Sequence, residues 1–242
     1  MLFLFSMTTL TEWLILLIAS FVPPLIYMVW IRNTERCQRQ SWGSVLLCFL
    51  WGASIAVIAA LILEILLKIS FSASITDIST VSFYTVVVIA PIAEEFTKPL
   101  ALRLKPVKRH ITELEDGLIY GAVAGLGFSA TENLFYGYEF FQVGFLYFLF
   151  LIILRSIGAC LLHASATALT GYGYGKSLLK HTSLLRVFPY FVLAMIVHGA
   201  YNFMVYFELP GVITGLFVAF IFVFISISLI RKKIMQLDRK TC

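Results

Sequence analysis

The chain has 242 residues, of which 60% are apolar and only 13% are charged, and its mean hydropathy is +0.94. This composition excludes an ordinary water-soluble globular protein and is typical of an integral membrane protein. The formal net charge of +5 does not indicate a nucleic-acid partner, because the basic residues gather at the predicted membrane ends, where they favour contact with anionic lipid.

Seven apolar runs follow one another along the chain, each long enough to cross about 30 Å of hydrocarbon at about 1.5 Å per residue. They cover approximately residues 8–31, 42–68, 80–103, 117–138, 144–170, 187–207 and 210–230. The longest polar connection, about residues 105–116, is short. The sequence therefore predicts an all-α, polytopic bundle of about seven transmembrane helices, with residues 1–242 forming a single integral membrane domain.

Basic residues alternate between the two ends of these predicted helices. The connections near Asp77, Glu139 and Glu208 carry no Lys or Arg, whereas the other connections and the tail do. The basic residues are Arg32, Arg36 and Arg39; Arg103, Lys105, Lys108 and Arg109; Lys176, Lys180 and Arg186; and Arg231, Lys232, Lys233, Arg239 and Lys240. Because Lys and Arg next to membrane spans stay on the cytoplasmic side, we expect the N-terminus outside and the C-terminus in the cytoplasm.

Four consecutive predicted helices carry polar residues that hydropathy alone would not place in a membrane. They are Glu94, Glu95 and Lys98 in the third helix, Glu132 and Asn133 in the fourth, Arg155 and His163 in the fifth, and His198 and Asn202 in the sixth. An uncompensated charge inside a bilayer costs at least a few kcal/mol, so these residues need a partner or a function. Glu94 and Lys98 are four residues apart, and so are His198 and Asn202, so each pair shares a helix face. Each helix can therefore direct its polar group toward one interior site.

The paired glutamates lie between two prolines, Pro91 and Pro99. Each proline removes a backbone donor, which predicts a distorted or water-accessible helix at this point. Small residues such as Gly125 and Gly199 lie near the polar positions and allow helices to approach closely. This combination is suited to a polar pocket that is sealed from lipid.

Glutamate and histidine together admit two chemistries, and the first requires a metal. Glu132, His163 and His198 would bind Zn²⁺ and leave an open coordination position for water. Glu94 or Glu95 would then accept the proton of the water as it attacks a peptide carbonyl.

The second chemistry requires no metal. A buried glutamate would act with a histidine as the general base, while His198 and Asn202 would stabilise the oxyanion. In either case Lys98, one turn after Glu94, would hold one carboxylate ionised by charge pairing. The sequence alone does not separate the two versions. Arg155 is expected to neutralise a carboxylate or contact a phosphate headgroup, and Asn133 and Tyr136 belong to the same supporting set.

At these residues the chain resembles the PrsW family of intramembrane proteases. That family belongs to the superfamily of CAAX prenyl endopeptidases and bacterial immunity-type proteins, and it is distantly similar to the APH-1 subunit of gamma-secretase. The resemblance rests on Glu94-Glu95-x-x-Lys98, on Phe128-x-x-x-Glu132-Asn133-x-x-Tyr136-Gly137, on His163 and on His198-x-x-x-Asn202. It spans about residues 85–205 and gives an expected catalytic core of about residues 80–207. The CAAX branch usually has a histidine at the position of Glu132, so the glutamate favours the PrsW branch.

The resemblance implies an enzyme that hydrolyses a peptide bond of a membrane-anchored protein, as in the regulated proteolysis of anti-sigma factors. It also implies a multi-pass protein of the prokaryotic plasma membrane. The family is usually classed with the metallopeptidases, which places the zinc version first. The alternatives are a metal-free glutamate protease of the CAAX type, a non-catalytic scaffold, and a transporter that uses the buried acids and histidines as a path.

Some of the same residues also have a simpler interpretation. Glu94, Glu95 and Lys98 would in that case form a self-neutralising ion-pair cluster that fixes helix register. Glu64, with Lys68 one turn later, is most simply interpreted as a local pair on the helix surface.

Overall fold

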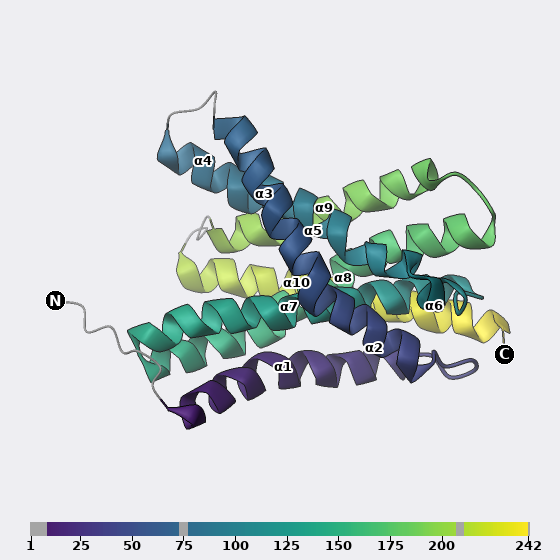
Figure 1. Ribbon diagram of the computed structural model, residues 1–242, viewed down its shortest axis with the longest axis horizontal. Coiled ribbons are helices and arrows are strands. Elements are labelled where there is room, and N and C mark those ends of the chain that lie inside the picture. Colours follow the sequence, from purple (N-terminus) through teal and green to yellow (C-terminus); the bar gives the residue numbers. More distant parts are fainter. Residues whose placement is uncertain (1–8, 73–76, 207–210, 242) are drawn as a thin grey trace.

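The computed structural model describes residues 9–72, 77–206 and 211–241, and this part of the chain is helical without strands (Figure 1). Within it, six helical segments are long and apolar enough to cross a membrane. They are α1 (Leu10–Arg32), α2 to α3 (Trp42–Ser72), α4 to η3 (Ile78–Arg103), α8 (Phe145–Leu179), η4 to α9 (Leu184–Tyr206) and Ile213–Lys240 within α10 (Val212–Thr241). The predicted multi-pass helical bundle is confirmed.

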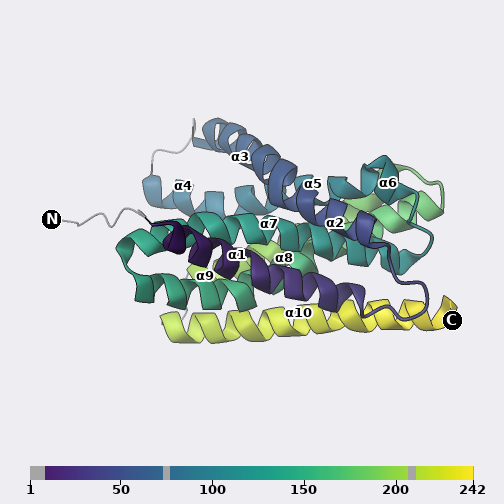
Figure 2. The same cartoon turned by 60° about the horizontal axis from the view of Figure 1, so that its bottom comes forward.

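A further helix, α7 (Leu114–Val143), is long enough to span a membrane but does not have the composition of a span. It has 30 residues, which corresponds to about 45 Å. Residues 115–130 are all buried, because α7 runs through the centre of the bundle (Figure 2). A helix that is surrounded by protein need not present an apolar surface to lipid, which explains why its polar residues and glycines are tolerated.

Two of the apolar segments are interrupted by non-α-helical turns. The first contains α2 (Trp42–Trp51), the π-helix η1 (Gly52–Ala56) and α3 (Val57–Ser72). The second contains α4 (Ile78–Tyr84), the π-helix η2 (Thr85–Ile89), α5 (Ala90–Thr97) and the 3₁₀-helix η3 (Lys98–Arg103). Pro91 lies just after the π-helix η2, and Pro99 is the second residue of the 3₁₀-helix η3. The predicted distortion of the helix around the paired glutamates is therefore confirmed. The short helix α6 (Lys105–Lys108) lies in a connection, and the 3₁₀-helix η4 (Leu184–Val187) begins the segment that continues as α9 (Phe188–Tyr206).

The backbones of α7 and α8 approach each other closely along a line of glycines. A Cβ atom built on Gly121 would lie 2.5 Å from the carbonyl oxygen of Thr167, and one on Gly125 would lie 2.2 Å from that of His163. No larger residue fits there without moving a helix. The glycines therefore fix the height at which His163 and Thr167 face α7.

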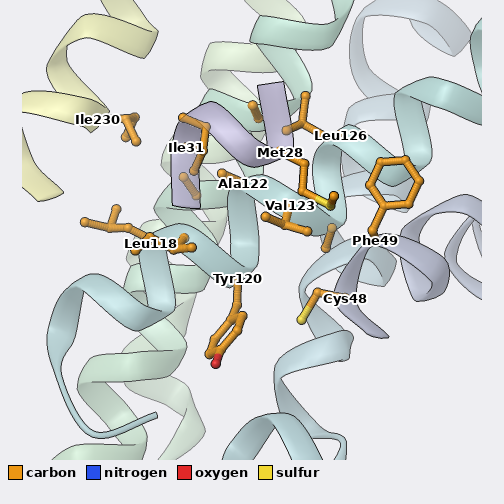
Figure 3. Close-up of a cluster of buried hydrophobic side chains, with 14 of the residues drawn as sticks. Met28, Ile31, Cys48, Phe49, Leu118, Tyr120, Ala122, Val123, Leu126 and Ile230 are labelled. Carbon is orange, nitrogen blue, oxygen red and sulfur yellow. The ribbon is translucent and has the colours of Figure 1, made fainter. Parts of the chain in front are cut away.

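The remaining helices pack around this pair. Figure 3 shows side chains of α1, α2 and α10 gathered against α7. The labelled members are Met28, Ile31, Cys48, Phe49, Leu118, Tyr120, Ala122, Val123, Leu126 and Ile230, and all of them are buried. This apolar core joins the N-terminal and C-terminal helices to the central hairpin.

The two ends of the bundle differ in charge. The connections at 33–41, 104–113 and 180–183 and the C-terminal part of α10 lie together at one end, on the right in Figures 1 and 2. We call this the basic end, because the Lys and Arg residues of the predicted cytoplasmic connections lie there. The connection between α7 and α8, where Gly144 has φ 154°, lies at the opposite end (Figure 1). Which end faces the cytoplasm stays a prediction.

Candidate active site

The centre of the candidate site is an ion-paired triad at the junction of α5 and η3. Lys98 Nζ lies 2.7 Å from Glu94 Oε2 and 2.9 Å from Glu95 Oε1. The Lys98 and Glu95 side chains are fully buried, and Glu94 is 6% exposed. Since one ammonium faces two carboxylates, the triad carries a surplus of negative charge. That surplus must be met by further groups, because buried charge without compensation is strongly destabilising.

Two histidines from α8 and α9 complete the cluster. His163 Nδ1 lies 2.8 Å from Lys98 Nζ, and His198 Nδ1 lies 2.9 Å from Glu95 Oε1. The imidazole rings are nearly perpendicular, with centroids 4.9 Å apart. An ammonium can only donate, so His163 Nδ1 accepts; a carboxylate only accepts, so His198 Nδ1 donates. A neutral His198 therefore has its lone pair on Nε2, which lies 3.9 Å from Glu94 Oε2.

Glu132 of α7 contacts His163 on the other edge of its ring. The distance between His163 Nε2 and Glu132 Oε2 is 2.7 Å. Arg155 Nη2 lies 3.2 Å from the same carboxylate oxygen, and Arg155 Nε donates to Asn133 Oδ1 at 2.9 Å. The guanidinium also lies 4.1 Å from the ring centroid of Tyr136. The predicted supporting residues are thus brought together around Glu132, whose side chain is 20% exposed.

Thr167 is a member of the cluster that the sequence analysis missed. Its Oγ1 donates to Glu95 Oε2 at 2.9 Å, and the residue is fully buried. With Lys98 and His198 on Oε1, both oxygens of Glu95 are engaged. In Glu94, by contrast, only Oε2 takes part in the contacts that the described residues form. The two adjacent glutamates therefore differ in their contacts: both oxygens of Glu95 are held, whereas Glu94 is held through one oxygen only. The spacing of four residues between His163 and Thr167 was the available signal.

Asn202 makes a different contact from the one expected. Its Nδ2 donates to the carbonyl oxygen of Val86 at 2.9 Å, within the π-helix η2. One turn earlier, Gly199 packs so closely on Val87 that an added Cβ would lie 2.6 Å from the Val87 carbonyl oxygen. Asn202 therefore satisfies backbone in the distorted helix, and its role in oxyanion stabilisation stays a prediction.

Glu64 was interpreted from the sequence as the local partner of Lys68, and that interpretation was wrong. None of the ion pairs within the described residues contains Glu64. Glu64 interacts electrostatically with Glu132 and Lys98 instead. The spacing of four residues between Glu64 and Lys68 gave a sufficient local explanation for the charge of Glu64, so the sequence analysis did not consider a partner on another helix.

The donor atoms of this cluster are arranged closely enough for one metal ion. One atom from each of Glu94, Glu95, His163 and His198 lies within 4.8 Å of the others. In a tetrahedral zinc site with bonds of about 2.0–2.2 Å, neighbouring donors are about 3.4 Å apart. Nitrogen and carboxylate oxygen are ligands that suit Zn²⁺. Lys98 Nζ lies among these same atoms, so a cation already interacts with them.

Comparison with known proteins agrees with this geometry. Residues 40–229 match the family described as PrsW family intramembrane metalloprotease. The chain belongs to the PrsW family. It is also similar to Protease PrsW of Clostridioides difficile (strain 630), with 29% identity over 202 residues, which is 80% of each chain. No solved structure matches the chain. This PrsW family member is a multi-pass membrane peptidase, and its buried cluster of Glu and His is suited to a metal ion.

Proposed function

We propose that this PrsW family member hydrolyses a peptide bond of a membrane-anchored protein, as in the regulated proteolysis of anti-sigma factors. We place it in a prokaryotic plasma membrane, with the basic end in the cytoplasm and the catalytic core at residues 80–207. The observation that carries the proposal is the convergence of Glu94 with His163 and His198 at one buried point, reached from three helices.

We assign the role of general base to Glu94. Its Oε2 is held by Lys98 at 2.7 Å, and Oε1 is left to accept a proton. Lys98 favours the ionised carboxylate, which is the form that a base requires. Glu95 is the positioning residue of the pair, because Lys98, Thr167 and His198 hold both of its oxygens.

We propose Zn²⁺ as the metal, with His163 and His198 as its nitrogen donors. When bound, zinc lowers the pKa of water and polarises a carbonyl group. Lys98 must then give up its contact with His163 Nδ1. Glu132, the third ligand expected from the sequence, contacts His163 Nε2, and we propose that it orients this ring as an outer-shell carboxylate.

The metal-free version shares Glu94 as the base and differs in the role of His198. An oxyanion needs a hydrogen-bond donor. In the neutral His198 tautomer that donates through Nδ1 to Glu95, however, Nε2 carries a lone pair. A lone pair that is directed at the cluster suits a metal ligand better than an oxyanion donor, and this favours the zinc version.

Metal content and cleavage, measured on the same preparations, test the proposal. Wild type, Glu94→Gln, His198→Ala and the control His110→Ala, which changes an exposed histidine, would be purified in detergent and analysed for zinc. Each would then be assayed in proteoliposomes on a single-pass reporter, with and without a chelator. We expect one zinc per chain and chelator-sensitive cleavage in wild type and His110→Ala, and loss of both in His198→Ala.

The outcomes separate the versions. Cleavage that depends on Glu94, is insensitive to chelator and occurs without bound metal would establish the glutamate mechanism. The proposed function would be contradicted if neither removal of zinc nor Glu94→Gln changed the rate of cleavage. It would also be contradicted if wild type cleaved no membrane-anchored reporter.

A further inference from the structure

The segment η1–α3 contacts the central helix α7 closely at η1 and then separates from it along α3. At η1 the contact is close: a Cβ on Gly52 would lie 2.0 Å from the Ala124 carbonyl oxygen, and Thr131 Oγ1 donates to the Ala53 carbonyl at 2.6 Å. Beyond η1, α3 diverges from α7 in both views (Figures 1 and 2). Its buried residues are Val57 and Ala60, and none follows Ala60 in α3. The outer half of α3 is therefore separated from α7.

Glu64 lies where this separation begins. It follows Ala60 by four residues and so continues the same helix face. Ala60 packs in one apolar cluster with Ala93 of α5 and Phe128 of α7. Glu64 is half-buried, and its electrostatic interactions are with Glu132 and Lys98. Glu64 thus lies on the face of α3 that Ala60 packs against α5 and α7.

The cations of the site are already engaged by other carboxylates. Lys98 is paired with Glu94 and Glu95, and Arg155 is paired with Glu132. Glu64 forms no ion pair within the described residues. A carboxylate at membrane depth without a paired cation is costly, and such residues mark sites at which a ligand or substrate supplies the missing partner.

Space for a peptide continues along α3. A cavity of about 470 Å³ lies between α3 and the α4–η2 segment, and Lys68, Ser82 and Thr85 are among the residues that line it. A peptide segment that is unwound from a helix must find hydrogen-bond partners for its backbone inside a membrane. The hydroxyl groups of Ser82 and Thr85 offer such partners, across the cavity from Lys68, which lies one turn beyond Glu64.

We propose that Glu64 is a substrate-binding residue that pairs with a basic side chain, Lys or Arg, of a peptide segment that enters along α3, beside the cavity between α3 and the α4–η2 segment. The proposal rests on the proposed peptidase function and adds a charge preference to it. The occupant follows from charge complementarity, since the surplus of carboxylates around Glu64 attracts cations and repels acidic substrates. A long basic side chain also reaches a carboxylate from the lipid side while its aliphatic part stays in apolar surroundings.

The test is a charge exchange between enzyme and reporter. Three single-pass reporters that differ in one residue beside the cleaved bond, Lys, Gln or Glu, would be assayed in proteoliposomes. The enzymes are wild type, Glu64→Gln, Glu64→Lys and the control Glu139→Gln, which removes an exposed acid of α7. We expect wild type and Glu139→Gln to cleave the Lys reporter with a kcat/KM about tenfold or more above that of the Glu reporter. Glu64→Gln should remove this preference, mainly through KM, and Glu64→Lys should reverse it.

Different failures have different meanings. Wild type that cleaves none of the reporters would overturn the peptidase proposal itself. Cleavage of all three at equal rates by wild type, or an unchanged preference in Glu64→Lys, would overturn the role of Glu64 and leave the peptidase standing. A uniform loss of kcat on every reporter in Glu64→Gln would mean that Glu64 is structural, and it would also overturn the inference.

Discussion

Two clusters of buried acids lie at different heights in this bundle, and they are built from different partners. At the basic end, Asp116 Oδ2 accepts from the backbone N–H groups of Thr112 at 2.6 Å and Glu113 at 2.8 Å. Glu35 likewise accepts from the backbone N–H of Gln40 at 3.1 Å. In the catalytic cluster, the carboxylates of Glu94, Glu95 and Glu132 contact lysine, arginine, histidine and threonine side chains instead.

This difference in partners is the one that we expect between structural acids and reactive ones. A backbone N–H neither moves nor exchanges its role, so an acid that is bound to it holds a connection in place. The Gln40 amide links Glu35 to Asp116, and the Tyr120 hydroxyl donates to it. Asp238 of α10 binds the backbone of the same connection, at Arg36 and Cys37. Imidazole and ammonium groups can give up protons or bind a metal, so burial alone does not identify an active site, whereas the kind of partner does.

Matched changes of one acid in each cluster give the largest expected contrast. Glu94→Gln keeps the shape of the side chain and removes the proton acceptor, so kcat should fall by about 10²- to 10⁴-fold. Glu35→Gln, at the basic end, should leave kcat within about twofold of wild type, because it keeps the volume and one acceptor oxygen. Both are measured on a membrane reporter in proteoliposomes. Equal losses in the two variants would mean that the two clusters do not differ in function.

A change of Lys98 tests the difference between the two clusters through the stability of the protein. Lys98→Met leaves Glu94 and Glu95 buried without their shared ammonium, which should cost about 3–5 kcal/mol of unfolding free energy. The double variant Lys98→Met with Glu94→Gln should recover part of this loss, since one uncompensated charge is removed. The measurement is unfolding in detergent, followed by circular dichroism. A single variant as stable as wild type would contradict the view that this ammonium compensates the pair.

The catalytic cluster was far more accessible to prediction than the cluster at the basic end. Glu94, Glu132 and His163 stand out because they interrupt apolar runs. Glu35 and Asp116 lie in or beside polar connections, where acids are expected to be solvated, and only the fold buries them. The expected bundle and the meeting of four helices followed from hydropathy and spacing. The depth of each polar residue in the membrane did not follow from the sequence, because it depends on where glycines such as Gly125 fix one helix against another.

The missed residues show the same limit. Threonine is common in membrane helices, so the spacing of four residues between His163 and Thr167 was too weak a signal to distinguish Thr167 from a packing residue. Glu64 had a plausible partner at Lys68, which removed any reason to look for another. The identity of a contact across helices depends on rotation about the helix axis, and a single sequence gives that rotation only where polar residues are few and unambiguous.

The hydroxyl of Thr167 gives a smaller and more selective test of the catalytic cluster. Thr167→Val removes the hydrogen bond to Glu95 at nearly constant volume, and kcat should fall by about 10- to 100-fold, since a hydrogen bond to a charged group is worth about 1.5–3 kcal/mol. Thr167→Ser should restore most of the rate, because it returns the donor. If Thr167→Ser were as slow as Thr167→Val, the defect would come from packing and not from the positioning of Glu95.

The smallest expected effect concerns pH and the basic end. Burial, followed by the nearby charge of Asp116, raises the pKa of Glu35 from 4.5 to about 8. The folded state therefore keeps a proton that the unfolded chain loses, so the contribution of Glu35 to stability is complete below pH 4.5 and falls as the pH rises toward 8. Glu35→Gln carries no such proton, and its melting temperature should decline less than that of wild type between pH 6 and 8, by a difference of a few degrees. Identical pH dependence in the two proteins would show that Glu35 is ionised in the fold, and the acids at the basic end would then need a cationic partner, as those of the catalytic cluster do.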